Sequence, residues 1–386
     1  MALHASTFAN SMRLLEGELI HELVKDTPSD LQLLPSMLLP RDRWLLGSAL
    51  QKTIRRGLCI DATDAALTLY SIDAEYAWRR LRVIAIEDVG IGDIETVATV
   101  LAVAGKRALR RTFGDQRLLV LLVNALCVAP KDRTACDLLC WIELSPAVAR
   151  FRSELLCTPD RWEALAKDDC APMWRRAVAM QLVAGFTIKT REGYQVVTRG
   201  DSAVWRRIVE ALKPHPMVAF ASLRGSNTES LNIALPFAQL YRDAANRAPL
   251  IRCEGETQNP LRIGRFIAPA FCMHTRVGLR ALRLFLSRET EFHAELIRAG
   301  ATDKIKALGF LLFQIESGLL DRFEDYAPEV RTEAERAELA HYGIFEDADA
   351  VVLRMMLKQR MPALDAARRR AWDAYEGEIA DGVLSL

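Results

Sequence analysis

Two adjacent carboxylates, Glu87 and Asp88, follow an arginine-rich segment and are the side chains of this sequence best suited to acid–base chemistry. General acid–base catalysis needs groups that flank one site, but neighbouring residues of a helix point about 100° apart. The acids also fall near the C-terminal end of a predicted helix, where the helix dipole disfavours negative charge. We therefore expect them to contact arginines, with Arg79 and Arg80 as partners, across a helix or subunit contact. A metal site is the alternative for Asp88 with Asp93. The residues assigned to the structural or oligomer contact are Glu87, Asp88, Gly90 and Asp93.

A second segment, Met273–Leu286, places a histidine before regularly spaced arginines. Thr275 is suited to cap a helix there, and three arginines at i, i+4 and i+7 would share one face of it. Guanidinium groups on one face suit phosphate or a partner's carboxylates. His274 lies too far along the chain from His293 for the local spacing of a zinc site, so a hydrogen bond near the helix start is the favoured reading.

Several helical segments carry such basic faces, and together they are the candidate DNA-binding or partner-binding residues. Taken singly, each basic face is more typical of a solvated helix surface than of a DNA contact. If several converge on one surface, they form a groove for phosphates, whose affinity falls steeply with salt. The candidates are Arg79, Arg80, Arg82, Lys106, Arg107, Arg110, Arg111, His274, Arg276, Arg280 and Arg283.

The motifs of nucleotide hydrolysis and of other common chemistries are missing from the sequence. There is no G-x-x-x-x-G-K-[ST] phosphate-binding loop, no G-x-S-x-G nucleophile motif and no local Cys–His arrangement. The eight cysteines form no C-x-x-C pair, and Cys136 with Cys140 lacks a second ligand pair for zinc. We therefore expect no catalytic residues, no metal and no cofactor.

The elements that must position these residues are nearly all helices. Apolar residues recur at helical spacing over residues 5–26, 41–56, 94–109, 117–128 and 348–372. Asp61 or Thr63 is expected to cap the helix after residue 56, and the basic residues at the end of 41–56 are expected to be solvated. Residues 186–198 alternate around Arg191-Glu-Gly193, which predicts a β-hairpin. The predicted fold is mostly α, with a collar-like helical bundle or array over 1–165 and a mainly helical domain with the hairpin over 166–386.

One stretch resembles a known family. Ala77–Asp93 reads A-W-R-R-L-R-V-I-A-I-E-D-V-G-I-G-D, preceded by Asp64-Ala-Ala-Leu and followed by Ala125-Leu-Cys-Val-Ala-Pro-Lys131. In order and spacing these pieces resemble the C-terminal helical oligomerisation region, or collar, of the replication-associated recombination protein A and Werner-helicase-interacting AAA+ ATPases, which are related to clamp loaders. The resemblance covers roughly residues 56–139 and excludes the ATPase domain. It implies homo-oligomerisation and a place in DNA replication or repair.

The bulk properties narrow the functional classes. The 386 residues carry a formal net charge of +1, so there is no global basic field and any nucleic-acid contact must be local. No signal-peptide pattern or long apolar run is present, so we expect a cytoplasmic protein without a membrane contact. The leading hypothesis is a non-enzymatic, oligomerising accessory protein of DNA replication or repair that binds DNA or a replisome partner. The alternative is a scaffold or assembly subunit of a mobile-element or phage complex that partners a separate AAA+ ATPase without binding DNA.

Overall fold

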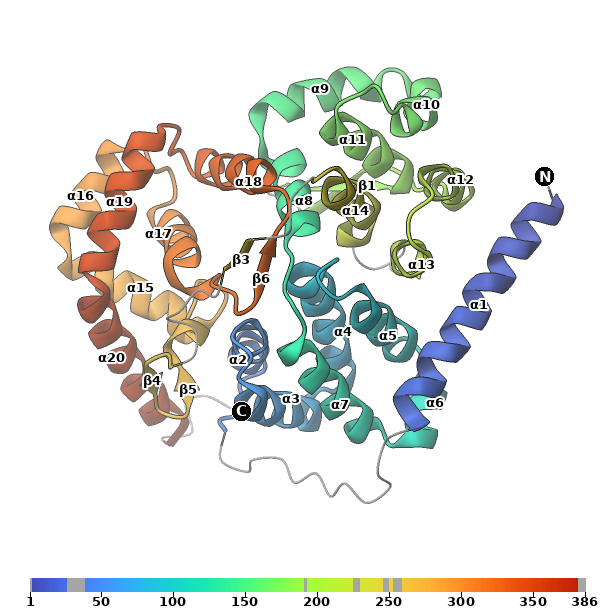
Figure 1. The fold of residues 1–386 in the computed structure, drawn as a ribbon. Helices are drawn as coiled ribbons and strands as arrows, with labels where there is room; N and C mark the ends of the chain where they lie inside the picture. The colour runs from blue at the N-terminus through green and yellow to red at the C-terminus, as the bar shows by residue number, and fades with distance from the viewer. Residues whose placement is uncertain are drawn as a thin grey trace.

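The mostly helical prediction is confirmed by the computed structural model, in which helices make up most of the described residues. The structure describes residues 2–25, 39–190, 193–224, 230–245, 250–252 and 259–380. Within these ranges it contains twenty α-helices and three two-stranded antiparallel sheets. Figure 1 shows α2 between the helices of the first third of the chain and those of the last third.

The first half of the chain is an array of helices joined by short turns. Asp42 caps α2, because its Oδ1 accepts hydrogen bonds from the backbone N–H groups of Trp44 and Leu45 at 2.8 and 2.9 Å. Helix α2 packs along α3, and α3 along α7. The elements are α1 (Ala2–Lys25), α2 (Arg43–Arg55), α3 (Cys59–Ile72), α4 (Ala74–Ile84), the π-helical turn η1 (Ala85–Val89), α5 (Ile94–Ala104), α6 (Arg107–Phe113), α7 (Asp115–Val128), α8 (Thr134–Leu144) and α9 (Pro146–Leu156).

The middle of the chain contains the predicted hairpin, whose two strands pair antiparallel. The tip residues Arg191 and Glu192 lie outside the described residues. Asp201 caps the helix that follows, accepting from the N–H of Ala203 and Val204. The elements are η2 (Pro159–Arg161), α10 (Trp162–Lys167), α11 (Met173–Ala184), β1 (Phe186–Thr190), β2 (Gly193–Thr198), α12 (Ser202–Leu212), α13 (Pro216–Arg224), η3 (Ser230–Ala234), α14 (Leu235–Ala244) and β3 (Leu250–Arg252).

The last third is a group of helices that packs against α2 and α8. Strand β3, which precedes this group in the chain, pairs antiparallel with β6, which lies within the group. The elements are β4 (Arg262–Ile263), β5 (Phe266–Ile267), η4 (Ala268–Ala270), α15 (Arg276–Arg288), α16 (Thr290–Arg298), α17 (Lys304–Leu312), the π-helical turn η5 (Phe313–Ser317), β6 (Phe323–Asp325), α18 (Pro328–His341), α19 (Asp347–Gln359) and α20 (Met361–Ala380).

The apolar core forms two clusters of buried side chains. The larger extends from α1 to α15, with further members around α18 and in α20, and includes residues on both sides of position 165, where the sequence predicts a domain boundary. The smaller lies wholly within residues 282–367. The chain is therefore packed continuously through residue 165, and the two-domain division stays a prediction.

Three details of the predicted helices are wrong. The helix predicted over 94–109 ends at Ala104, where Gly105 caps it, and α6 starts anew. The helix predicted over 348–372 is divided at Arg360, because Pro362 lacks an N–H and is tolerated only in the first turn of α20. Neither Asp61 nor Thr63 caps α3, which begins at Cys59 after Leu58.

Candidate functional site

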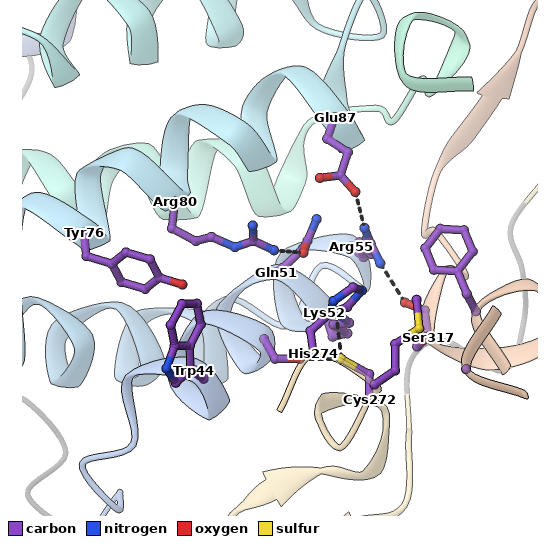
Figure 2. Close-up of a pocket in the computed structure, with 15 residues that line it drawn as sticks. Trp44, Gln51, Lys52, Arg55, Tyr76, Arg80, Glu87, Cys272, His274 and Ser317 are labelled. Carbon is purple, nitrogen blue, oxygen red and sulfur yellow. Dashed lines mark hydrogen bonds and ion pairs between the residues drawn. The ribbon is translucent and has the colours of Figure 1, made fainter. Parts of the chain in front are cut away.

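A cleft of about 450 Å³ opens beside α2 and brings together the two segments that the sequence singled out. It is lined by side chains of α2, α4, η1, the loop before α15, α17 and η5, and we call it the α2 cleft (Figure 2). Arg80 and Glu87 reach it from the first segment, and His274 from the second, although nearly two hundred residues separate them. The candidate residues of the two segments thus converge at one place.

Helix α2 supplies a polar face to this cleft from inside the protein. Ser48, Lys52 and Arg55 lie at i, i+4 and i+7, so they share one side of the helix. Lys52 is only 4% exposed and Arg55 only 1%. The expectation that the end of this helix is solvated is therefore wrong, because the last third of the chain covers it. Charged side chains that are buried need an oppositely charged or hydrogen-bonding partner, which can be another side chain or a ligand.

Glu87 and Asp88 do contact arginines, but not the expected ones. The Arg55 Nε donates to Asp88 Oδ1 at 2.7 Å, and Arg55 Nη2 donates to Glu87 Oε1 at 2.9 Å. Arg133 adds a second ion pair to Asp88 at 3.2 Å. Arg79 and Arg80 form no ion pair with either acid among the described residues. The metal alternative for Asp88 is thereby disfavoured, since both its oxygens already accept from Arg55 and Gln51.

A π-helical turn explains how acids at the end of α4 reach inward. The N–H of Gly90 bonds the Ala85 carbonyl at 2.9 Å, an i→i+5 bond that closes η1. Asp88 is fully buried. Burial raises its pKa, but Arg55 and Arg133 outweigh burial and hold the pKa below its usual value. A second π-helical turn, η5, contributes Phe313 to the lining of the cleft, where the Arg55 and Arg133 guanidinium groups lie 5.3 and 4.6 Å from its ring centroid.

Gly90 and Asp93 have structural roles within the chain. Gly90 has φ +52°, and a Cβ there would lie 2.5 Å from the Asp132 carbonyl oxygen, so only glycine fits. Asp93 caps α5, its Oδ1 accepting from the N–H of Thr96 at 3.0 Å. Both residues fix the turn that follows the two acids.

Two cations of the cleft have no carboxylate partner within the described part of the chain. Arg55 and Arg133 balance Glu87 and Asp88, which leaves Lys52 and Arg80. The Lys52 Nζ donates to the Cys272 sulfur at 3.6 Å, and Arg80 donates to the side-chain oxygen of Gln51. Burial, together with Arg55 and Arg80, lowers the pKa of Lys52 to about 8 in spite of its sulfur neighbour.

The loop before α15 places a thiol and an imidazole at the cleft. Thr275 caps α15 as predicted, its Oγ1 accepting from the N–H of Gly278 at 3.0 Å. Cys272 is buried at the floor, and the exposed His274 lines the wall. Desolvation of its imidazole at the cleft wall, together with the nearby charges of Lys52 and Arg80, lowers the pKa of His274 to about 4, so its ring is neutral at pH 7.

Gly278 lets this loop lie directly on α15. A Cβ at residue 278 would stand 2.0 Å from the Cys272 carbonyl oxygen and 2.6 Å from Thr275 Oγ1. Gly278→Ala is therefore expected to displace the loop and to lower the free energy of unfolding by about 1–3 kcal/mol. Urea denaturation would measure this loss. The control is Gly377→Ala in α20, where a Cβ meets no atom within 4 Å; it is expected to stabilise by about 0.5–1 kcal/mol. An equal response of both variants would contradict the close approach.

The mouth of the cleft is aromatic and cationic. Trp44 is 49% exposed and meets Tyr76 edge to face, with 5.9 Å between the ring centroids. The Arg43 guanidinium lies 5.0 Å from the Trp44 centroid, and that of Arg79 lies 5.8 Å from the Tyr76 centroid. Rings flanked by cations offer a stacking surface beside positive charge.

The other predicted basic residues do not reach the cleft. Around α6, Lys106 pairs with Glu16, Arg107 and Arg110 pair with Glu75, and Arg110 is buried over the Trp78 ring. On α15, Arg280 pairs with Glu378. The remaining members of the predicted set do not line it either; they are Arg82, which is half-buried, and Arg111, Arg276 and Arg283, which are exposed.

From the sequence, Lys52 and Arg55 were expected at a solvated helix end, and neither Ser48 nor Cys272 was assigned to a site. The signal for α2 was present, because Ser48, Lys52 and Arg55 are polar residues at one-face spacing on a helix with an apolar side. No local pattern marks Cys272, whose neighbours Ser48 and Lys52 are more than two hundred residues earlier. In the described part of the chain there is no group of three His, Cys, Asp or Glu side chains that could hold a metal, and no helix long and apolar enough to cross a membrane.

Comparison of the chain with protein-family models, with curated proteins and with solved structures found no match.

Proposed function

We propose that this chain is a non-enzymatic accessory protein of DNA replication or repair, and that it binds DNA with a backbone phosphate seated in the α2 cleft. One observation carries the proposal. Lys52 and Arg80 direct positive charge into a cleft of about 450 Å³ without a carboxylate partner in the described residues. A buried ammonium and a half-buried guanidinium favour an anionic ligand, because the ligand supplies counter-charge that no carboxylate of the described chain provides.

The mouth makes a nucleotide strand the best-fitting anion. A base can stack on Trp44 or Tyr76 while its phosphate reaches inward to Arg80. The planar guanidinium of Arg80 suits two phosphate oxygens, and Lys52 adds a compact charge deeper in the cleft. Arg79 extends the positive surface outside the cleft, and Arg43, which pairs with Asp73 at 3.3 Å, lies over the Trp44 ring. A single strand fits this arrangement better than a duplex, since only unpaired bases expose a stacking face.

The context of the binding rests on the resemblance of residues 56–139 to the collar of clamp-loader-like ATPases. We infer that the chain forms a homo-oligomer in the cytoplasm and acts beside a separate AAA+ ATPase or replisome protein. In an oligomer, several α2 clefts would engage one strand and raise its overall affinity without new contacts.

Binding of labelled single-stranded DNA, followed by fluorescence anisotropy at several salt concentrations, tests the proposal. We expect log Kd to change linearly with log salt. Arg80→Ala is expected to weaken binding about tenfold and to reduce the salt slope by roughly one charge. The matched control is Arg206→Ala, an exposed arginine of α12 outside the cleft, which should bind as the wild type does.

Two outcomes would contradict the proposal. The first is the absence of DNA binding at low salt, which would favour the assembly-subunit alternative. The second is equal weakening by Arg80→Ala and Arg206→Ala, which would show a diffuse basic surface rather than a seated phosphate. Replacing Arg276, Arg280 and Arg283 together by alanine, with solution mass as the readout, separates a DNA contact on α15 from an oligomer interface.

A further inference from the structure

The thiol of Cys272 lies at the floor of the α2 cleft among groups that activate it. Lys52 Nζ is 3.6 Å and Ser48 Oγ 3.3 Å from its sulfur. Ser48 has one hydroxyl proton and a second acceptor, the Ala270 carbonyl oxygen at 2.8 Å. The hydroxyl can therefore accept from a thiol or, after rotation, donate to a thiolate. Figure 2 shows the lysine and the sulfur meeting at the end of the cleft.

Two other cysteines of the described chain are in the opposite environment. Burial raises the pKa of Cys127, and the hydrogen bond with Cys136, together with burial, raises that of the half-buried Cys140. Burial acts in the same sense on Cys272, but the Lys52 ammonium and the Ser48 hydroxyl outweigh burial and lower its pKa. A thiolate next to an ammonium, at the end of a cavity large enough for a small molecule, is the arrangement of a reactive cysteine.

We propose that Cys272 is a reactive thiolate that captures anionic low-molecular-weight disulfides, which the α2 cleft directs onto its sulfur. The thiolate attacks one sulfur of the disulfide, a new S–S bond to Cys272 forms, and the original S–S bond breaks. The departing sulfur takes the electron pair and leaves as a thiolate, which the Lys52 ammonium or water can protonate. Arg80 and Lys52 bind the carboxylates of the incoming molecule.

This inference does not require that DNA is the natural ligand. Where DNA does bind, the anionic group left on Cys272 would occupy Lys52 and Arg80, so modification would weaken DNA binding. A failure of DNA binding leaves the thiol chemistry measurable, and a failure of the thiol chemistry leaves DNA binding measurable.

The test incubates the full chain with glutathione disulfide and follows each cysteine by peptide mass spectrometry. Exposed Cys157 and Cys170 serve as references in the same molecule. We expect Cys272 to react faster than either, since the thiolate is the attacking form and the Lys52 ammonium beside the sulfur favours it. The ratio of the rate at Cys272 to the rates at Cys157 and Cys170 should decrease when the uncharged 2-hydroxyethyl disulfide replaces glutathione disulfide. It should also decrease with added salt, since charge directs the anionic reagent to the cleft.

Lys52→Met tests the activating group. We expect the rate at Cys272 to fall about tenfold, the rates at Cys157 and Cys170 to stay unchanged, and Lys52→Arg to restore part of the loss. Ser48→Ala is the second variant, with a smaller decrease at Cys272 alone. The proposal is overturned if Cys272 stays unmodified while Cys157 and Cys170 react. It is also overturned if, in the wild type, the ratio of the rate with glutathione disulfide to the rate with 2-hydroxyethyl disulfide is the same at Cys272 as at Cys157 and Cys170.

Discussion

Asp88→Asn is expected to lower the free energy of unfolding by about 3–5 kcal/mol, the cost of breaking a buried ion pair from one side. Asp88 is fully buried and is held by Arg55 at 2.7 Å and by Arg133 at 3.2 Å. The amide keeps the shape of the side chain but removes the charge. Two buried guanidinium groups would then share only the partly exposed Glu87 as counter-charge. Urea denaturation at pH 7 measures the effect.

The control is Asp347→Asn, which removes a carboxylate from an exposed pair with Arg336. Exposed pairs contribute at most about 1 kcal/mol, because water screens them. The charge at Asp88 also predicts a pH dependence. Its pKa is lower in the folded chain than in the unfolded one, so the stabilisation is present above about pH 4 and is lost as the pH falls through the folded value. Equal losses for the two variants would show that burial does not strengthen the pair.

Local patterns predicted most elements of the fold. The cap of α15 was found from a single residue, Thr275, because capping depends only on the next turn of backbone. The hairpin followed from alternation around Gly193. The errors were local as well: a proline two residues into α20 was treated as the interior of a longer helix.

The candidate site was only partly predictable, since periodicity shows which face of a helix is polar but not which distant segment covers it. Arg80, Glu87 and His274 were singled out from the sequence, and they line one cleft. Their partners were not found. Arg55 lies 32 residues before Glu87, and Cys272 lies 220 residues after Lys52. Such pairings depend on tertiary packing around a helix that is buried on every side.

The affinity of the α2 cleft for an anion is expected to fall as the pH rises through about 8, by up to tenfold per pH unit above that value. Lys52 is an ammonium at pH 7, because burial lowers its pKa only to about 8. A bound anion favours the protonated form, so binding takes up a proton above pH 8 and weakens as protons become scarce. Anisotropy of labelled single-stranded DNA from pH 6.5 to about 9.5 measures the change.

Three variants separate Lys52 from its neighbours in this pH profile. Lys52→Arg stays protonated throughout, so its affinity should hardly change above pH 8, and Lys52→Met should bind weakly with a similarly flat profile. The thiol raises the pKa of Lys52, opposing burial and the positive charges of Arg55 and Arg80, so Cys272→Ser should move the decrease to lower pH. His274 cannot produce the decrease, since its pKa of about 4 leaves it neutral over the whole range. A decrease near pH 8 that persists in Lys52→Arg would assign the titration to another group and remove Lys52 from the anion site.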